Sequence, residues 1–360
     1  EVEMSGRIPK NIVAAVTVAV VLSSIAAGDA YSAPRKSEFQ KGMNYVTFSK
    51  ERMSSKESDD SLKAISRTGA KWVSIVVTWY QESCSSTGIF PTDNSPGDES
   101  VIHAINTIHA LKMKAVLKPH LELIDTSGGS WRGDIACSKE EWGEWFDSYG
   151  KFAVHYAKMA QDQKVEMFCI GTELSSISVM KEELWKEKVI SPVRGLYSGP
   201  LVYAANWDEE YNNVVFWEDM DYVGIDAYFP LSDKDKPTYK EIVAGWEKWA
   251  KDIEVFQAKV NKPLVFTEAG YCSAQGTTKI PWEEVAKGPV DMQLQANCYK
   301  ALMETFWQKR WFYGVYWWKW GTSAKFGGPN NRGFTPQNKT AQDIVKKWYG
   351  KSIPSKMYGK

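Results

Sequence analysis

The sequence carries no net charge, has few cysteines and lacks the short motifs that mark phosphate or serine-hydrolase sites. Lysine and arginine total 44 in 360 residues, and aspartate and glutamate also total 44. Without an overall field to attract polyanions, we expect no nucleic acid partner. The chain also lacks a phosphate-binding loop and a Gly-x-Ser-x-Gly turn, which excludes P-loop and nucleophile-elbow chemistry.

Five cysteines occur at unrelated spacings, with no Cys-x-x-Cys pair and no histidine and carboxylate grouping of metal-site spacing. We therefore expect no metal, no organic cofactor and no disulfide framework of a small secreted domain. Cys169 lies in a strand pattern and Cys298 in a helix pattern, so both are expected to be buried. For an exported chain we predict a disulfide between Cys84 and Cys137, which follow the second and third predicted strands.

The first residues resemble a secretory signal rather than part of the fold. Basic residues precede the apolar stretch 12–27, and small residues follow it. We predict a signal peptide over 1–33, a secreted or periplasmic location, and no stable membrane association after cleavage. The alternative is an uncleaved anchor helix. The folded domain is predicted over 34–350 with a C-terminal tail at 351–360, and we expect a monomer.

Strand-like and helix-like patterns alternate along the rest of the chain. The strand candidates are 42–48, 72–80, 115–120, 165–172, 201–206, 222–228, 264–268 and 314–320, and helical stretches include 99–112, 140–161, 239–260 and 291–308. The aromatic residues of 140–161 recur at helical spacing and are expected in the core. Eight apolar strands, each followed by a helix or long loop, predict an α/β fold with a single (β/α)8 TIM barrel. An open doubly wound sheet is the competing fold, but no Gly-x-Gly-x-x-Gly follows the first strand.

Two stretches end an apolar run with threonine and glutamate. Glu173 closes the fourth predicted strand in FCIGTELSS, and Glu268 closes the seventh in PLVFTEAGY. In a TIM barrel, chemistry sits at the C-terminal ends of the strands, and strands four and seven face each other across the opening. Two carboxyl groups about 5–5.5 Å apart would suit retaining glycoside hydrolysis, in which one protonates the leaving oxygen and the other attacks the anomeric carbon. The alternative is a structural ion pair at the rim for each glutamate.

Six ordered motifs carry a resemblance to a known family. LKPH, FCIGTELSS, YAANWDEE, DYVGIDAYFPL, LVFTEAGYCS and YGVYWWKW closely resemble glycoside hydrolase family 113, β-mannanases of clan A, and the resemblance covers residues 41–349. It implies that Glu173 is the acid/base, that Glu268 is the nucleophile, and that Tyr228 hydrogen-bonds the nucleophile.

Two positions depart from the wider clan. Most members have asparagine before the acid/base, where it holds the sugar 2-hydroxyl, whereas this chain has Thr172, as expected of family 113. Mannose and glucose differ in the orientation of that hydroxyl, so the change is compatible with a mannosyl unit. The second strand, KWVSIVVTWYQ, lacks the arginine that commonly supports the nucleophile in the clan. Lys118 and Arg132 are the nearest candidates to replace its charge.

Polar and aromatic residues near the predicted strand ends form the candidate substrate site. They are Trp79, Lys118, His120, Trp131, Arg132, Asn206, Trp207, Asp226, Trp318 and Trp320, and tryptophans among them could serve as platforms for sugar rings. Asp226 has an alternative as a capping or ion-pair group, and His120 as a rim histidine bonded to backbone. The loop with Trp131 could wall the cleft or be an ordinary surface loop.

The last strand holds four large side chains of alternating direction. Trp318 and Trp320 share one face, and Trp317 and Lys319 share the other. We expect the first pair to face the cleft, because residues of opposite parity would meet the surrounding helices.

These features together predict a retaining glycoside hydrolase that acts on β-1,4-linked mannan or manno-oligosaccharides and whose expected partner is a polysaccharide or oligosaccharide. A hydrolase or transglycosylase acting on another β-linked polysaccharide is a second interpretation. A non-catalytic carbohydrate-binding barrel is a third, although such a protein has no need for two mutually repelling carboxylates.

Overall fold

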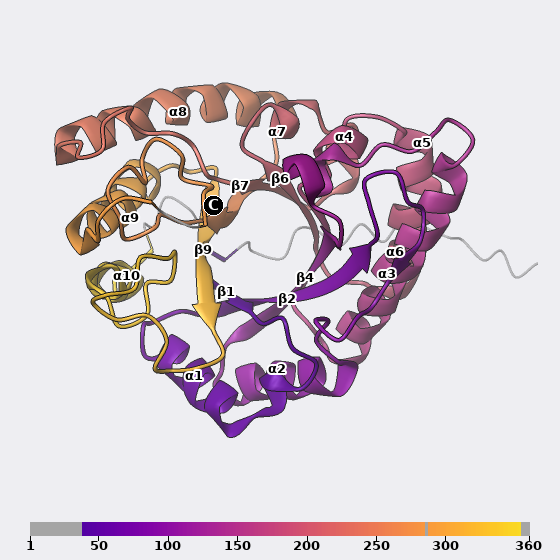
Figure 1. Ribbon diagram of the computed structural model, residues 1–360, viewed down its shortest axis with the longest axis horizontal. Helices are drawn as coiled ribbons and strands as arrows, with labels where there is room; N and C mark the ends of the chain where they lie inside the picture. The colour runs from indigo at the N-terminus through magenta and orange to yellow at the C-terminus, as the bar shows by residue number, and fades with distance from the viewer. Residues whose placement is uncertain (1–37, 285–286, 354–360) are drawn as a thin grey trace, which may run out of the picture. The chain divides into compact units, whose positions relative to one another are not determined.

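Runs of valine, isoleucine and aromatic residues form the strands at the centre of the fold, as their apolar character predicts. The computed structural model describes residues 38–284 and 287–353. Its parallel strands are β1 (Gln40–Val46), β2 (Trp72–Gln81), β4 (Lys114–Leu123), β5 (Met167–Thr172), β6 (Leu201–Asn206), β7 (Tyr222–Asp226), β8 (Leu264–Ala269) and β9 (Phe312–Gly321). Because β1 pairs with both β2 and β9, the sheet closes on itself. The predicted TIM barrel is confirmed (Figure 1).

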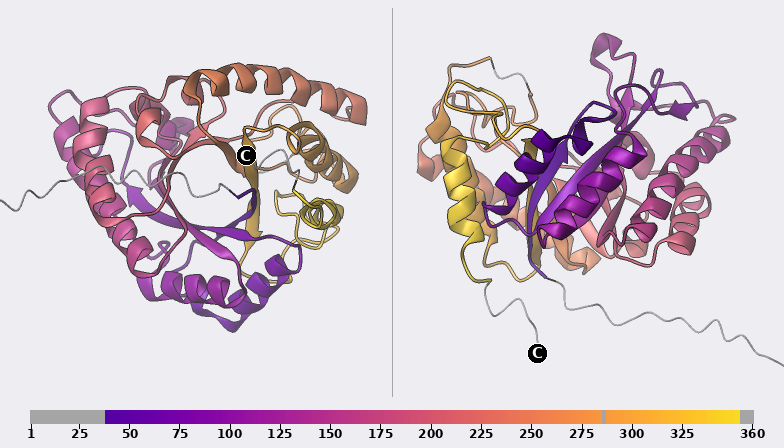
Figure 2. Two further views of the ribbon diagram at one scale, coloured as in Figure 1. Left: turned by 180° about the vertical axis from the view of Figure 1, so that it is seen from behind. Right: turned by 90° about the horizontal axis from the view of Figure 1, so that it is seen from below.

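Helices surround the strands, as Figure 2 also shows from behind and from below. They are α1 (Lys56–Ser66), α2 (Asp98–Ala110), α3 (Trp142–Asp162), α4 (Ser175–Ser178), α5 (Glu182–Leu184), α6 (Ser191–Leu196), α7 (Glu210–Asn213), α8 (Tyr239–Val260), α9 (Met292–Phe306) and α10 (Thr340–Tyr349). Short 3-10 turns cover Arg52–Ser54, Ser127–Gly129, Arg132–Asp134 and Trp217–Asp219, and a π turn covers Trp185–Ile190. The short strand β3 (Ile89–Phe90), which pairs antiparallel with β2, was not predicted.

Two helices illustrate how local sequence sets the architecture. The aromatic face of α3 is buried against the barrel, as predicted, and the Tyr149 hydroxyl donates to Ile170 O at 2.9 Å. α8 has the predicted bounds. It begins with a capping box in which Thr238 accepts from Glu241 N, and it ends at Asn261, whose φ of 53° lies in the left-handed region.

The cysteine predictions have mixed outcomes. Cys169 and Cys298 are buried, as predicted. Cys84 and Cys137 both carry free thiols, so the predicted disulfide is not present. The two loops do meet, since Ala136 N donates to Cys84 O at 3.0 Å. The Cys137 thiol, however, is directed at Ser86 O, 4.0 Å away.

The predicted signal peptide, 1–33, lies outside the described residues, as do residues 354–360 of the predicted tail. No helix within 38–284 and 287–353 has the length and apolar character needed to cross a membrane.

Candidate active site

The mouth of the barrel brings the two predicted glutamates into one group of charged side chains. Glu268 lies in β8, and Glu173 directly follows β5, where its backbone φ of 50° turns the chain out of the strand. Both residues are buried, with 3% and 7% of their surface exposed. Buried carboxylates need partners, because an unpaired charge away from water is strongly unfavourable.

Glu268 is held by three side chains, two from β4 and one that follows β7. Lys118 donates to its Oε1 atom, and the Tyr228 hydroxyl donates to its Oε2 atom at 2.6 Å. His120 Nε2 lies 3.5 Å from Oε1. Burial raises the pKa of Glu268, but Lys118 and His120 outweigh burial and hold that pKa at about 2. Glu268 is therefore ionised at neutral pH.

A second buried carboxylate shares the lysine. Lys118 Nζ lies 3.2 Å from Asp226 Oδ1, which also accepts from the Thr267 hydroxyl at 2.7 Å. Burial and the charge of Glu268 raise the pKa of Asp226 well above its usual range, although Lys118 opposes them. Lys118 therefore lies between two buried carboxyl groups and contacts both. The ion-pair alternative for Asp226 describes this contact.

Glu173 has a different set of partners. Arg132 Nη1 donates to its Oε2 atom at 2.7 Å, and Asn206 Nδ2 donates to its Oε1 atom at 2.9 Å. Burial raises the pKa of Glu173 to about 7; Arg132 opposes this rise and the charge of Glu268 adds to it. Two carboxyl groups at one site thus have pKa values on opposite sides of the ordinary value, which is the pattern of an acid beside an ionised carboxylate.

Arg132 reaches the site from the loop after β4. Its guanidinium also forms an ion pair with Glu122, and its Nε donates to Leu121 O at 2.9 Å. Burial raises the pKa of Glu122, but Arg132 and His120 bring it down to about 2. The adjacent Trp131 is 37% exposed. The loop therefore presents an aromatic side chain to solvent while its arginine is fixed between two carboxylates.

The two candidates for the missing arginine are now distinguished. Lys118 contacts Glu268, whereas Arg132 contacts Glu173. Lys118 is therefore the cation beside Glu268. Thr172 does not point its hydroxyl into the mouth, because that hydroxyl donates to Pro119 O at 3.0 Å.

The prediction that Trp79 lies in the cleft is wrong. In the parallel register of β2 and β4, Val76 pairs with Lys118 and Thr78 with His120, so these residues face the barrel interior. Trp79 has the opposite parity and stacks on Phe152 of α3 at 5.0 Å.

In β9 the prediction is half right. The Trp318 ring lies parallel to His120, at 5.8 Å between centroids, and is in the site. Trp317 stacks on Tyr299 of α9 at 3.8 Å, as its parity requires. Trp320 is also buried outside the barrel, where its Nε1 donates to Ser61 of α1. The register with β1 shifts between Met43 and Tyr45, so β9 has an extra residue there and the alternation breaks.

Trp207 lies at the rim and stacks on Trp282 at 5.2 Å. Trp282 is 45% exposed and comes from the loop after β8. Glu284 in this loop forms an ion pair with Lys319, and the Cys272 thiol donates to Glu283 O at 3.3 Å. Trp282 was not predicted, because nothing in its local pattern marks it as part of the site.

Glu210, the first residue of α7, was also missed. It is 3% exposed and accepts four hydrogen bonds next to Glu173 and Asn206. The motif YAANWDEE contains it, but sequence alone does not show which acidic residue of that motif turns inward.

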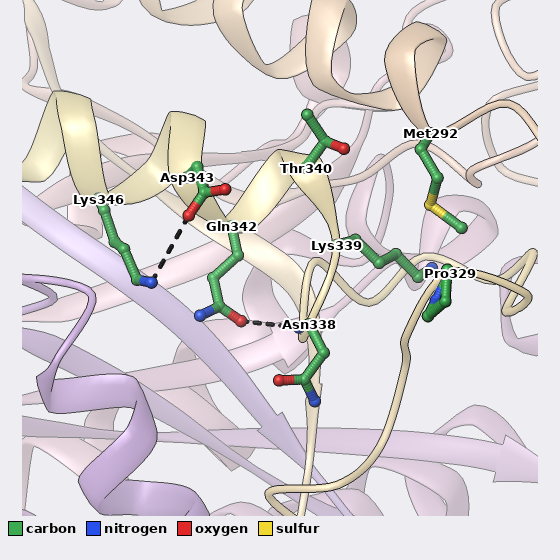
Figure 3. Close-up of a pocket in the computed structure, with 8 residues that line it drawn as sticks. All are labelled: Met292, Pro329, Asn338, Lys339, Thr340, Gln342, Asp343 and Lys346. Atoms are coloured by element: carbon green, nitrogen blue, oxygen red, sulfur yellow. Dashed lines mark hydrogen bonds and ion pairs between the residues drawn. The ribbon is translucent and has the colours of Figure 1, made fainter.

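A pocket of about 340 Å³ lies elsewhere, beside the start of α10 (Figure 3). It is lined by Met292, Pro329, Asn338, Lys339, Thr340, Gln342, Asp343 and Lys346. None of the predicted site residues lines it, and its single carboxylate, Asp343, pairs with Lys346 at 3.6 Å. Within the described ranges, no three histidine, cysteine or acidic side chains are grouped to hold a metal ion. The candidate site is therefore the barrel mouth.

Residues 43–339 match the family model of Glycoside Hydrolase Family 113. The chain belongs to this family. Two solved structures resemble this family 113 hydrolase over most of its length. A GH113 β-1,4-mannanase, solved as a complex, is 27% identical, with 88% of this chain and 100% of that chain covered and a TM-score of 0.79. The GH113 β-mannanase AaManA from Alicyclobacillus acidocaldarius, in complex with ManMIm, is 26% identical, with 87% and 97% covered and a TM-score of 0.78.

A glycoside hydrolase family 5 mannosidase from Rhizomucor miehei shares the fold at 12% identity, with 87% of this chain and 92% of that chain covered and a TM-score of 0.58. A search of curated protein sequences found no significant match.

Proposed function

We propose that this family 113 hydrolase cleaves β-1,4-linked mannan or manno-oligosaccharides with retention of configuration. The observation that carries the proposal is the pair of buried carboxyl groups, with the pKa of Glu173 raised to about 7 and that of Glu268 held at about 2. Mannan as substrate is supported by the family relatives, two of which are described as β-mannanases. Two repelling carboxylates in one buried site do not suit a protein that only binds sugar.

In the first step, Glu268 attacks the anomeric carbon while Glu173 gives its proton to the glycosidic oxygen. The carbon–oxygen bond to the leaving sugar breaks, and an ester to Glu268 forms. In the second step, Glu173 removes a proton from water, the water oxygen bonds to the anomeric carbon, and Glu268 leaves as a carboxylate. Tyr228 and Lys118 each contact one oxygen of Glu268, so they orient it for attack.

Several predicted residues are placed to bind the sugar that is cleaved. His120 lies 3.5 Å from Glu268, and its ring is parallel to that of Trp318. His120 Nε2 forms no hydrogen bond to another described residue. We infer that Trp318 stacks on the sugar and that His120 bonds one of its hydroxyls. Asn206 and Arg132 bond Glu173, Trp207 follows Asn206, and Trp131 precedes Arg132. We infer that Asn206, Trp207 and Trp131 bind the leaving part of the chain.

A substrate panel tests this function. Purified protein is incubated with β-1,4 manno-, gluco- and xylo-oligosaccharides, product sizes are read by mass, and the first anomer released is read by NMR. The proposal expects cleavage of the manno-oligosaccharides with the β anomer formed first. Cleavage of another series only, longer products from transfer, or an α anomer formed first would each contradict part of it.

We further propose that the protein is exported, on the strength of the apolar stretch 12–27 and the basic residues before it. We also propose that it is a monomer. N-terminal sequencing of the protein recovered outside the cytoplasm should show cleavage near residue 33. Light scattering of that protein should give the mass of one chain.

A further inference from the structure

Glu210 is a buried carboxyl group that contacts Asn206 and lies near the proposed acid Glu173. It opens α7, which lies beside α4 (Figure 1). Its Oε1 atom accepts from the Ser178 and Tyr203 hydroxyls, both at 2.6 Å. Its Oε2 atom accepts from Asn206 N at 2.6 Å and from the Ser175 hydroxyl at 3.0 Å. In the part of the chain that the structure describes, all four donors are neutral.

These hydrogen bonds fix two neighbours of the acid: the residue that follows it in the chain, and the asparagine that donates to its carboxyl group. On one side, Leu174 N donates to the Tyr203 hydroxyl at 2.9 Å, and that hydroxyl donates to Glu210. Leu174 directly follows Glu173, whose positive φ needs support from its surroundings. On the other side, Glu210 holds the backbone of Asn206, whose side chain donates to Glu173 Oε1.

A carboxylate suits this position better than an amide. A carboxylate accepts at both oxygens, and hydrogen bonds to an ionised acceptor are shorter and stronger than neutral ones. A glutamine would offer one oxygen and one NH2 group, and that NH2 group cannot accept from Asn206 N or from three hydroxyl donors. Burial raises the pKa of Glu210, while the bonds from Ser178, Tyr203, Asn206 and Ser175 oppose that rise.

We propose that Glu210 is a positioning residue for the acid, because it fixes the turn after Glu173 and the amide of Asn206 so that the Glu173 carboxyl faces the leaving oxygen. The inference rests on the proposed role of Glu173. Its consequence is selective: proton delivery to the leaving group depends on Glu210, whereas attack by Glu268 does not. A residue that only stabilises the fold would affect both equally.

The test compares two substrates in the full-length variants Glu210→Ala and Glu210→Gln. A manno-oligosaccharide needs a proton on its leaving oxygen, whereas a dinitrophenyl β-mannoside does not. Glu210→Ala should lower the oligosaccharide rate by about 10²-fold, the cost of a small misplacement of a catalytic group. The first-turnover burst of dinitrophenolate should change by less than about fivefold, since no proton is transferred. Glu210→Gln should fall between wild type and Glu210→Ala.

Two further variants keep the comparison decisive. Tyr203→Phe retains the buried ring and removes the hydroxyl between Leu174 and Glu210, so it should shift the ratio of rates in the same direction even where Glu210→Ala folds poorly. Glu166→Gln is the matched control, because Glu166 also accepts from a backbone amide, Ala115 N at 2.8 Å, at the opposite end of the barrel. In Glu166→Gln, the ratio of the oligosaccharide rate to the dinitrophenyl mannoside rate should equal that of wild type.

Equal loss on both substrates, or no loss on either, in Glu210→Ala and Tyr203→Phe would overturn the positioning role. Wild-type turnover of the two mannosides tests the proposed function separately. If wild type cleaves a different glycoside, the same ratio measured on that glycoside and its dinitrophenyl analogue tests Glu210.

Discussion

The Arg132 guanidinium donates to Glu173 at 2.7 Å, so the carboxyl group that we assign as the acid has a cationic partner. Burial raises the pKa of Glu173 to about 7, and Arg132 is the strongest opposing influence. Because Arg132 belongs to the loop after β4, that loop adjusts the proton affinity of the acid.

Replacing Arg132 should move the alkaline limit of activity. kcat/KM requires protonated Glu173, and removing an adjacent cation raises the pKa of a carboxyl group, so Arg132→Met should shift the alkaline limb upward by about 1–3 pH units. A pH profile of kcat/KM on a manno-oligosaccharide measures the shift. Arg194→Met, which removes an exposed arginine paired with Asp221, should leave the limb in place. A downward shift in Arg132→Met would refute the assignment of Glu173 as the acid.

Glu173 also makes stability depend on pH. Its folded-state pKa of about 7 exceeds the value near 4.3 of an exposed glutamate. Ionisation therefore opposes folding: the destabilisation is absent below about pH 4 and complete above about pH 7. Glu173→Gln should raise the melting temperature at pH 8 by roughly 2–4 °C and leave it unchanged at pH 4. Thermal unfolding at the two pH values checks this, and a lower melting temperature for the variant at pH 8 would contradict it.

The sequence was sufficient for the barrel and its two glutamates because both depend on local pattern. Apolar runs define the strands, and the last polar residue of a strand must lie at the mouth. The predictions for Trp79 and Trp320 were wrong about the face of the strand to which each side chain points. That face can be assigned only when the pairing of residues between neighbouring strands is known. In β9, the shift opposite Met43 and Tyr45 reverses the direction of Trp320, and nothing in its own strand indicates that shift.

Glu210 and Trp282 escaped prediction for a different reason. Glu210 is defined by donors from α4 and β6, and Trp282 by its stack on Trp207. Such partners meet only after the barrel has closed. The same applies to Arg132, whose two carboxylate contacts could not be chosen from its position in the loop.

Removing the cation beside Glu268 should move the acid limit of activity. Lys118 favours the ionised form of Glu268, so Lys118→Met should raise the pKa of that carboxyl group and shift the acid limb of kcat/KM upward by about 1–3 pH units. The same pH profile measures it. Lys114→Met provides the control, because Lys114 lies at the other end of β4 and pairs with Glu38 at the surface. An unchanged acid limb in Lys118→Met would mean that Glu268 does not set that limb.

The exposed ring of Trp282 offers a platform for the leaving part of a chain. It rests on Trp207, which follows Asn206, and Asn206 bonds Glu173. We expect Trp282→Ala to raise KM for manno-oligosaccharides by about tenfold, as loss of one stacked ring implies, with little change for an aryl mannoside. Ile280→Ala is the control, since Ile280 is equally exposed in the same loop. Equal KM changes in both variants, or an equally large KM change for the aryl mannoside, would refute the proposed role of Trp282 as a platform.

The roles of the two glutamates are separated by their alanine variants. Glu268→Ala removes the covalent route and should abolish turnover of every substrate. Glu173→Ala should still form the glycosyl-enzyme from a dinitrophenyl mannoside, whose leaving group needs no proton, while polysaccharide cleavage falls by about 10²–10⁴-fold. A burst of dinitrophenolate followed by slow hydrolysis of the glycosyl-enzyme identifies the behaviour expected of Glu173→Ala.

Azide then reports which glutamate was lost. In Glu173→Ala, azide attacks the stalled glycosyl-enzyme in a second inversion, so the product should be the β-glycosyl azide. In Glu268→Ala, azide replaces the missing carboxylate and displaces dinitrophenolate directly, and a single inversion should give the α-glycosyl azide. NMR of the isolated azides distinguishes the two. Each displacement inverts the anomeric carbon, so the configuration of the azide shows whether one or two displacements occurred. Swapped products would mean that Glu173 is the nucleophile and Glu268 the acid.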